Sequence, residues 1–218
     1  MADRERPSTP RDRTLNDRAT RDRGRRTVSK LLEAAVAEFA AYGYQGARVG
    51  RIATRAGMAH GTFYVYFKDK DDLLVALYDE MMGDYLKLVR SLPPLRPGDD
   101  GRADVHTWVA AMCDDYRRHA AVRGAVHDAM MLDADRRLTT MALRALRHLT
   151  DLLAERIRAT GSPDLDPEIA ALCISNLLNT ASQAVAQSTF VASFDELVDG
   201  LTELVHRSVF GTSGVPNV

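Results

Sequence analysis

Residues 60–66 hold the side chains best suited to recognition chemistry. Their sequence, HGTFYVY, combines small, aromatic and hydroxyl side chains and has no acidic residue, lysine or arginine. A helix with such an outward surface suits the major groove of DNA, where it would touch base edges. Gly61 costs a helix about 1 kcal/mol relative to alanine. Its presence indicates either close approach to DNA or, as the alternative, a tight contact with another helix.

Other reactive side chains form no motif that we can identify. The sequence contains no nucleophile elbow, phosphate-binding loop or paired-carboxylate pattern, so we expect no enzyme, and an all-α enzyme stays as an alternative. The histidines between His106 and His206 lack ligand spacing, so no metal and no cofactor are expected. Cys113 and Cys173 would form a redox pair only if the fold brought them together.

Three short predicted helices position residues 60–66. The first has an apolar stripe at helical spacing and ends near Gly43; the stripe consists of Val28, Leu31, Leu32, Ala35 and Phe39. The second covers residues 49–56 and the third residues 59–67, with Gly57 supplying the positive φ of the turn between them. This arrangement predicts a helix-turn-helix over residues 48–67. A small core is expected from four side chains, Phe39, Ile52, Met58 and Phe67.

The rest of the chain also has helical periodicity. The predicted helices cover residues 70–92, 102–119, 122–132, 135–160, 167–189 and 194–210. Asp166 before Pro167 is typical of a helix start, and Ser193 with Glu196 forms a capping box. No segment alternates with period two for long enough to indicate a strand. The fold class is therefore all-α, with a three-helix head and a larger helical body.

Charge is divided unevenly along the chain. Residues 1–74 hold 15 of the 29 Lys and Arg and 10 of the 30 Asp and Glu, a formal charge of +5, which leaves −6 for residues 75–218. Only the head is thus suited to a polyanion. Residues 1–24, rich in arginine and poor in apolar side chains, predict a disordered basic arm. No apolar run of membrane-spanning length and no signal-peptide core are present, so a cytoplasmic protein without membrane contact is expected.

Residues 25–74 resemble the DNA-binding domain of the tetracycline-repressor (TetR) family. The residues that carry the resemblance are Arg25-Arg26, Leu31-Leu32-Glu33-Ala34-Ala35, Phe39, Tyr42-Gly43-Tyr44, Val49, Ile52-Ala53, Ala56-Gly57, Gly61-Thr62-Phe63-Tyr64-Val65-Tyr66-Phe67, Lys70 and Leu73-Leu74. The resemblance implies a domain order of arm (1–24), DNA-binding domain (25–74), effector-binding and dimerisation domain (75–210) and C-terminal tail (211–218).

The resemblance also assigns roles to individual side chains. Its base-facing positions are His60, Gly61, Thr62, Tyr64 and Val65, and its phosphate-contacting positions are Tyr64, Tyr66 and Lys70. Tyrosine hydroxyls and a lysine ammonium donate to phosphate and fix register without reading sequence. Where the family usually has hydroxyl residues before the two short helices, this chain has Ala47-Arg48 and Ala59, which removes two N-caps. Arg48 and Arg51 are further candidates for backbone contact.

For the body, the resemblance implies a small-molecule pocket and a homodimer. The expected pocket residues are Trp108, Met112, Tyr116, His127, Met130 and Met131, which favour a largely apolar effector. The expected dimer residues are Leu172, Asn176, Leu177, Thr180, Ala184, Leu201 and Val205. The implied function is a ligand-responsive transcriptional repressor of a palindromic double-stranded DNA operator. An activator or scaffold without an effector stays as an alternative.

Overall fold

The computed structural model describes residues 10–161, 166–186 and 193–211, and the side chains of 22–161, 166–183 and 193–211. All regular structure in these ranges is helical, which confirms the all-α fold class. The chain divides into two compact units, with the boundary in the sequence between Leu73 and Leu74. None of the described helices is long and apolar enough to cross a lipid bilayer.

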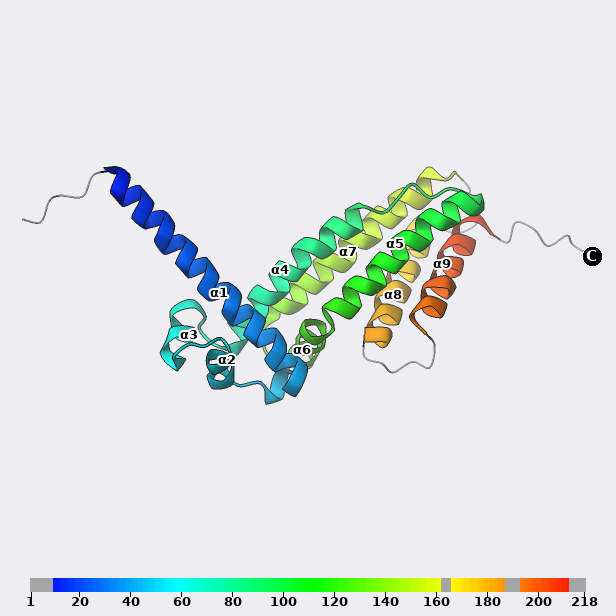
Figure 1. Ribbon diagram of the computed structural model, residues 1–218. Helices are drawn as coiled ribbons and strands as arrows, with labels where there is room; N and C mark the ends of the chain where they lie inside the picture. Colours follow the sequence, from blue (N-terminus) through cyan, green and yellow to red (C-terminus); the bar gives the residue numbers. More distant parts are fainter. Residues whose placement is uncertain (1–9, 162–165, 187–192, 212–218) are drawn as a thin grey trace, which may run out of the picture. The chain divides into compact units, whose positions relative to one another are not determined.

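The first unit contains α1 (Pro10–Gly46), α2 (Val49–Arg55) and α3 (His60–Tyr66) (Figure 1). Helix α1 begins earlier than expected, because residues 10–24 of the predicted disordered arm are helical. Arginine is a good helix former, and Arg25 pairs with Asp22 one turn before it. Residues 1–9 of the predicted arm lie outside the described ranges.

Glycines end α1 and shape the turn between α2 and α3. Gly43 has a φ of 63°, which interrupts α1 at the predicted stop. Gly57 has a φ of 71°, as the turn was predicted to need. The Met58 amide donates to the Ala53 carbonyl at 2.9 Å and closes the end of α2. The turn thereby fixes the direction in which α3 leaves.

The core of the first unit comes from the inward faces of α1, α2 and α3. Ile52 and Phe63 are fully buried, and Phe39 and Phe67 are nearly so. Burying each of these side chains stabilises the fold by about 1.5–3 kcal/mol. Met58, expected in the same core, is only half-buried. The core sets which face of α3 points outward.

The second unit begins within α4 (Lys70–Arg90) at Leu74. It continues with α5 (Gly98–Arg118), α6 (Ala120–Met131), α7 (Arg136–Ala159), α8 (Pro167–Ala186) and α9 (Phe194–Phe210). Helix α8 packs against α5, α7 and α9, and α9 also packs on α5 (Figure 1). The predicted bounds of these helices hold to within four residues. Residues 212–218 of the predicted tail lie outside the described ranges.

The predicted caps are formed. The Asp166 carboxylate accepts from the Glu168 amide at 3.0 Å and the Ile169 amide at 3.1 Å. Ser193 and Glu196 form the reciprocal bonds of a capping box at the start of α9. Helix α5 starts four residues earlier than expected, with Asp99 and Asp100 in its first turn, where negative charge is favoured.

Candidate functional site

Helix α3 presents most of its predicted recognition residues to solvent. Tyr64, Val65 and Tyr66 are 53%, 75% and 37% exposed, which is unusual for large apolar side chains. His60 and Gly61 are also exposed, and Thr62 is half-buried. Phe63, on the opposite side of the helix, is fully buried in the core. The structure thus brings six of the nine predicted DNA-binding residues together on one short helix.

Gly61 lies in open space. A Cβ atom built there would meet no heavy atom within 4 Å. A tight helix–helix contact within the described chain therefore does not explain this glycine. The neighbouring His60 ring packs edge-on against Tyr64, with 5.2 Å between ring centroids. The exposed side chains of His60, Tyr64 and Val65 thus flank an open position at Gly61.

A buried carboxylate organises the start of α2. Glu38 of α1 is fully buried, and its Oε1 accepts from the Arg48 amide at 3.3 Å and from Arg51 Nε. The Arg55 guanidinium lies 4.0 Å from Glu38 Oε2. Neither Arg48 nor Ala59 makes a side-chain cap at the helix it precedes, which matches the expected loss of capping hydroxyls. In a capping box, a glutamate side chain accepts from the backbone amide of the N-cap residue. Glu38 accepts in the same way from the amide of Arg48, but it does so from a neighbouring helix.

The Arg51 side chain is engaged inside the first unit. Besides Glu38, its guanidinium donates to the Gly46 carbonyl and lies 4.2 Å above the Tyr42 ring. Arg51 therefore ties α2 to the end of α1. The sequence offered no signal for this pairing, because Glu38 falls on a helix that could have faced solvent. The Arg48 side chain, by contrast, is exposed.

Lys70 is partly buried at the start of α4. Its ammonium donates to the Tyr44 carbonyl at 2.7 Å and lies 4.0 Å above the Tyr44 ring. Burial lowers the pKa of Lys70, and the Asp71 carboxylate opposes part of that decrease. The Tyr44 hydroxyl in turn donates to Asp71 at 2.6 Å. These contacts hold Lys70 close to the end of α1.

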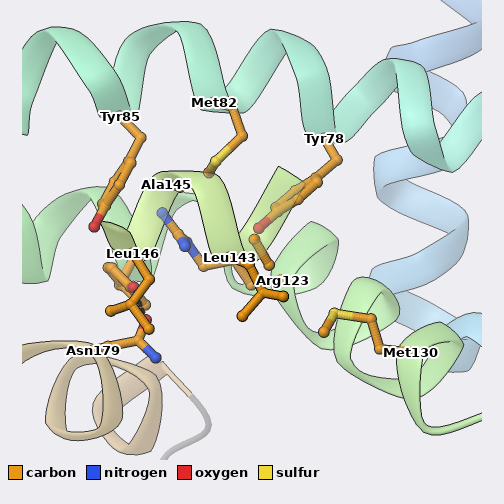
Figure 2. Close-up of a pocket in the computed structure, with 11 residues that line it drawn as sticks. Tyr78, Met82, Tyr85, Arg123, Met130, Leu143, Ala145, Leu146 and Asn179 are labelled. Atoms are coloured by element: carbon orange, nitrogen blue, oxygen red, sulfur yellow. Dashed lines mark hydrogen bonds between the residues drawn. The ribbon is translucent and has the colours of Figure 1, made fainter. Parts of the chain in front are cut away.

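The second unit contains a partly open cavity of about 140 Å³ (Figure 2). The cavity is bounded by side chains of five helices, α4 to α8. Its lining consists of Tyr78, Met82, Tyr85, Tyr116, Arg123, Met130, Ala142, Leu143, Ala145, Leu146 and Asn179. A second cavity of about 170 Å³ shares six of these residues and adds Val126, His127 and Gln183. The two spaces therefore adjoin.

Three of the six predicted pocket residues line these cavities. Tyr116 and Met130 line both, and His127 lines the second. The other three line none of the described cavities. Trp108 and Met112 are buried core residues, and Trp108 Nε1 donates to the Leu88 carbonyl at 3.0 Å. Met131 is 70% exposed at the end of α6 and lines none of the described cavities.

Arg123 is the main cavity residue that the sequence did not reveal. Its guanidinium lies 3.6 Å above the Tyr116 ring and donates to the Asp115 carboxylate at 2.9 Å. Its Nε is buried and has no hydrogen-bond partner in the described structure. Figure 2 shows the side chain reaching into the space between Tyr78 and Tyr85. A single cation within the otherwise uncharged residues 120–127 was the available signal.

Three tyrosines lie near this guanidinium: its carbon is 3.6 Å from the Tyr116 ring centroid and 5.3 Å from that of Tyr85, and Tyr78 lines the same cavity. Burial raises the pKa of Tyr78 to about 12 and raises the pKa of Tyr85 and Tyr116 as well. All three therefore keep their proton at neutral pH and act as hydrogen-bond donors. Tyr116 already donates to Asn179 Oδ1. That bond leaves the amide nitrogen of Asn179 as a further donor.

An apolar stripe runs along the outer face of α8. Ile169, Leu172 and Leu177 are 60%, 51% and 38% exposed, with Asn176 and Thr180 exposed on the same stripe. Leu204 of α9 adds a side chain that is 52% exposed. Four of the residues predicted for the dimer interface, Leu172, Asn176, Leu177 and Thr180, are thus exposed on this surface. The side chain of Ala184 lies outside the described ranges.

Two other predicted dimer residues are not exposed. Leu201 and Val205 are buried inside the second unit, where α9 packs on its own α5 and α8. Periodicity identified them as apolar but could not distinguish an internal face from an external one. The two cysteines also differ: Cys113 is buried, with Sγ 3.5 Å from the Ser182 hydroxyl, and Cys173 is exposed on α8.

Comparison with known proteins connects these features to a family. Residues 31–77 match the family model described as "Bacterial regulatory proteins, tetR family". The chain is 43% identical over 58 residues to the fatty acid metabolism regulator protein of Bacillus subtilis, covering 27% of this chain and 30% of that protein. It is 32% identical over 93 residues to an HTH-type transcriptional repressor of Streptomyces coelicolor, covering 43% and 44%.

The similarity of fold extends further than that of sequence. The crystal structure of the transcriptional regulator FadR from Bacillus subtilis, in complex with stearoyl-CoA, superposes with a TM-score of 0.59 at 20% identity. That match covers 83% of this chain and 98% of the other. The curated relatives, by contrast, are matched over less than half of their length. The family model matches residues 31–77, which include the helix-turn-helix, and the structural match shows a shared fold over most of the chain.

Proposed function

We propose that this chain, a member of the tetR family of bacterial regulatory proteins, is a transcriptional repressor. The repressor binds a palindromic operator as a homodimer. It releases the operator when a small molecule occupies the helical body. The observation that carries this proposal is the outward face of α3, which is uncharged, aromatic and open at Gly61. Regulation by binding is proposed, with no catalytic step.

Residues 25–74 form the DNA-binding domain in this proposal. Thr62, Val65 and His60 contact base edges, since a methyl group can pack on thymine and an imidazole can donate to a purine acceptor. Tyr64 and Tyr66 donate to phosphates and fix the register. Lys70 joins them by sharing its ammonium between phosphate and the Tyr44 carbonyl that it already contacts.

Residues 75–210 serve as the effector-binding and dimerisation domain. The exposed stripe of α8, with Leu204 of α9, supplies an apolar surface that a second copy would cover. Two copies related by a twofold axis would present their α3 helices to successive major grooves, about 34 Å apart. A palindromic operator follows from that symmetry.

Effector binding is coupled to DNA binding through α4, which begins in the first unit and continues in the second. Tyr78, Met82 and Tyr85 of α4 line the cavity, so an occupant contacts this helix directly. The stearoyl-CoA complex of the FadR neighbour supports a small organic molecule as the signal in this fold. A coupling of about 1–3 kcal/mol would weaken operator binding about 5–150-fold.

The experiment that tests this function is selection of random DNA by the purified chain, followed by gel-shift titration of the selected site. We expect a palindrome, loss of binding in Tyr64→Ala, and partial loss in Tyr64→Phe, which keeps the ring and removes only the phosphate donor. Normal binding by a Tyr64→Ala, Lys70→Ala double variant would contradict the proposed contacts. Transcription from a promoter bearing the site then distinguishes a repressor from an activator.

A further inference from the structure

Resting on the proposed function, we propose that the effector is a compact monocarboxylate whose carboxylate binds at Arg123 and whose single benzene-sized apolar group packs against Met82, Met130 and Leu146. This differs from the largely apolar effector that the sequence indicated. It also differs in size from the stearoyl-CoA bound by the FadR neighbour.

The first argument is the excess of hydrogen-bond donors around the cavity. Arg123, the Tyr78 hydroxyl and the Asn179 amide nitrogen are donors. The Tyr85 hydroxyl is engaged with Tyr116, and Asn179 Oδ1 is already occupied by the Tyr116 hydroxyl. No aspartate or glutamate is among the described residues that line the two adjoining cavities. A carboxylate only accepts hydrogen bonds, so it is the complement of such a lining.

The second argument is the incomplete pairing of Arg123. Asp115 occupies one side of the guanidinium at 2.9 Å, and Nε has no partner. A buried donor without a partner loses its hydrogen bond to water and gains none in return. A carboxylate in the cavity would pair with the guanidinium and supply that hydrogen bond after a small shift of the side chain. The planar fork of arginine suits two-point binding of a carboxylate.

The third argument is charge along a route into the cavity. The charge of Asp115 does not serve Arg123 alone, because the carboxylate is shared with His119, whose ring nitrogen lies 3.1 Å away. A hollow of about 360 Å³ between α4 and α7 is lined by Arg90, Arg144 and His148. Met82 and Ala145 line both this hollow and the cavity, so only flexible or small side chains separate them. An anion is favoured along this path, which has one lining carboxylate, Asp79.

The fourth argument is size. The first cavity has a volume of about 140 Å³. An apolar cavity of about 150 Å³ in another protein holds one benzene molecule. The remaining lining, from Met82, Met130, Leu143 and Leu146, is apolar and suits a ring or a short branched chain. An acyl chain of eighteen carbons would have to extend beyond this cavity into the adjoining cavity or the hollow between α4 and α7.

The test is calorimetric titration of the full chain with matched probes of one size. Phenylacetate is expected to bind at least tenfold more tightly than phenylacetamide, which has the same shape and no charge. Stearoyl-CoA is expected to bind more weakly than phenylacetate. Equal affinity for the acid and the amide would overturn the proposal. So would failure of phenylacetate, benzoate and 4-methylpentanoate to bind at all.

Two variants locate the site. Asn179→Asp keeps an acceptor for Tyr116 but adds a carboxylate beside Arg123, so it should lower phenylacetate affinity at least tenfold and leave phenylacetamide unaffected. Thr107→Asp adds the same charge at an exposed position of α5 that lines none of these cavities, and it should change neither affinity. Arg123→Lys keeps the charge beside Asp115 but loses the planar fork, so it should also weaken phenylacetate.

Equal effects of the Asn179 and Thr107 variants would overturn the site assignment. Operator binding by the unliganded chain separates this proposal from the proposed function. If the chain binds its operator through Tyr64 but prefers neutral ligands, the carboxylate effector is refuted and the repressor function stands. A chain that binds phenylacetate but no DNA refutes the repressor alone.

Discussion

Gly61 is the residue at which stability and DNA binding should change in opposite directions. Its Cβ position is open, so alanine fits without a clash. Gly61→Ala should therefore stabilise the first unit by up to about 1 kcal/mol. In the proposed complex the added methyl group meets the floor of the major groove, so operator affinity should fall about tenfold or more. Chemical denaturation and gel shift on one preparation measure both; a gain in both would remove close DNA approach as the reason for this glycine.

Glu38 is the residue on which the start of α2 depends. Glu38→Gln keeps the size of the side chain but loses the charge that Arg51 and Arg55 face, and we expect the first unit to lose about 1–3 kcal/mol of stability. Glu33→Gln, an exposed carboxylate on the same helix, is the matched control and should change stability little. Denaturant midpoints would test the pair, and equal effects would show that burial of Glu38 does not matter.

The sequence predicted which side chains are exposed better than it predicted which side chains pair with one another. The exposed residues of α3 and the inward Phe63 followed from helical spacing, which assigns faces within one element. The Glu38–Arg51 pair and the Arg123–Asp115 pair did not, because they depend on which helices meet. Met112 and Tyr116 lie four residues apart on α5, yet only Tyr116 reaches a cavity. Whether a side chain on one helix face reaches a cavity depends on the helices packed beside it and not on helical spacing.

At the scale of elements, the junction of α5 and α6 should respond to pH. His119 lies at this junction, and its hydrogen bond to Asp115 raises the pKa of the imidazole. Burial opposes ionisation of Asp115, but hydrogen bonds from His119 and Arg123 outweigh it and lower the pKa of the carboxyl. The protonated His119 is thus favoured in the folded chain over the unfolded chain.

The sign of this effect gives a prediction. The contribution of His119 is complete below its unfolded pKa near 6.5 and disappears as the pH rises through the higher folded pKa. The melting temperature of the chain should therefore exceed that of His119→Gln most at about pH 6 and least at about pH 9. Thermal melts of both proteins over that range measure it. A difference that grows with pH would contradict the assignment.

Element boundaries could be predicted closely because their signals are local. Gly43, Gly57, Asp166 and Ser193 each act within one or two turns. The start of α1 could not, because the helical state of residues 10–24 depends on continuation from a stable helix and not on apolar content.

At the scale of the whole molecule, dimerisation should depend on the outer stripe of α8. Leu172 is 51% exposed there, so Leu172→Asp should leave the fold intact and shift the protein toward monomer. Leu132→Asp changes an equally exposed leucine at the end of α6 and should leave the dimer unaffected. Sedimentation velocity across a concentration series distinguishes the two. Unchanged association of both variants would exclude this stripe as the interface.

The placement of the two cysteines gives the chain a built-in kinetic reporter. Cys113 is buried and Cys173 is exposed on the same stripe as Leu172 and Asn176, so a maleimide dye should react first with Cys173. If a second copy covers that stripe, the labelling rate should fall as protein concentration rises and approach the rate of subunit dissociation. A stopped-flow trace of dye incorporation would then measure subunit lifetime without any engineered probe.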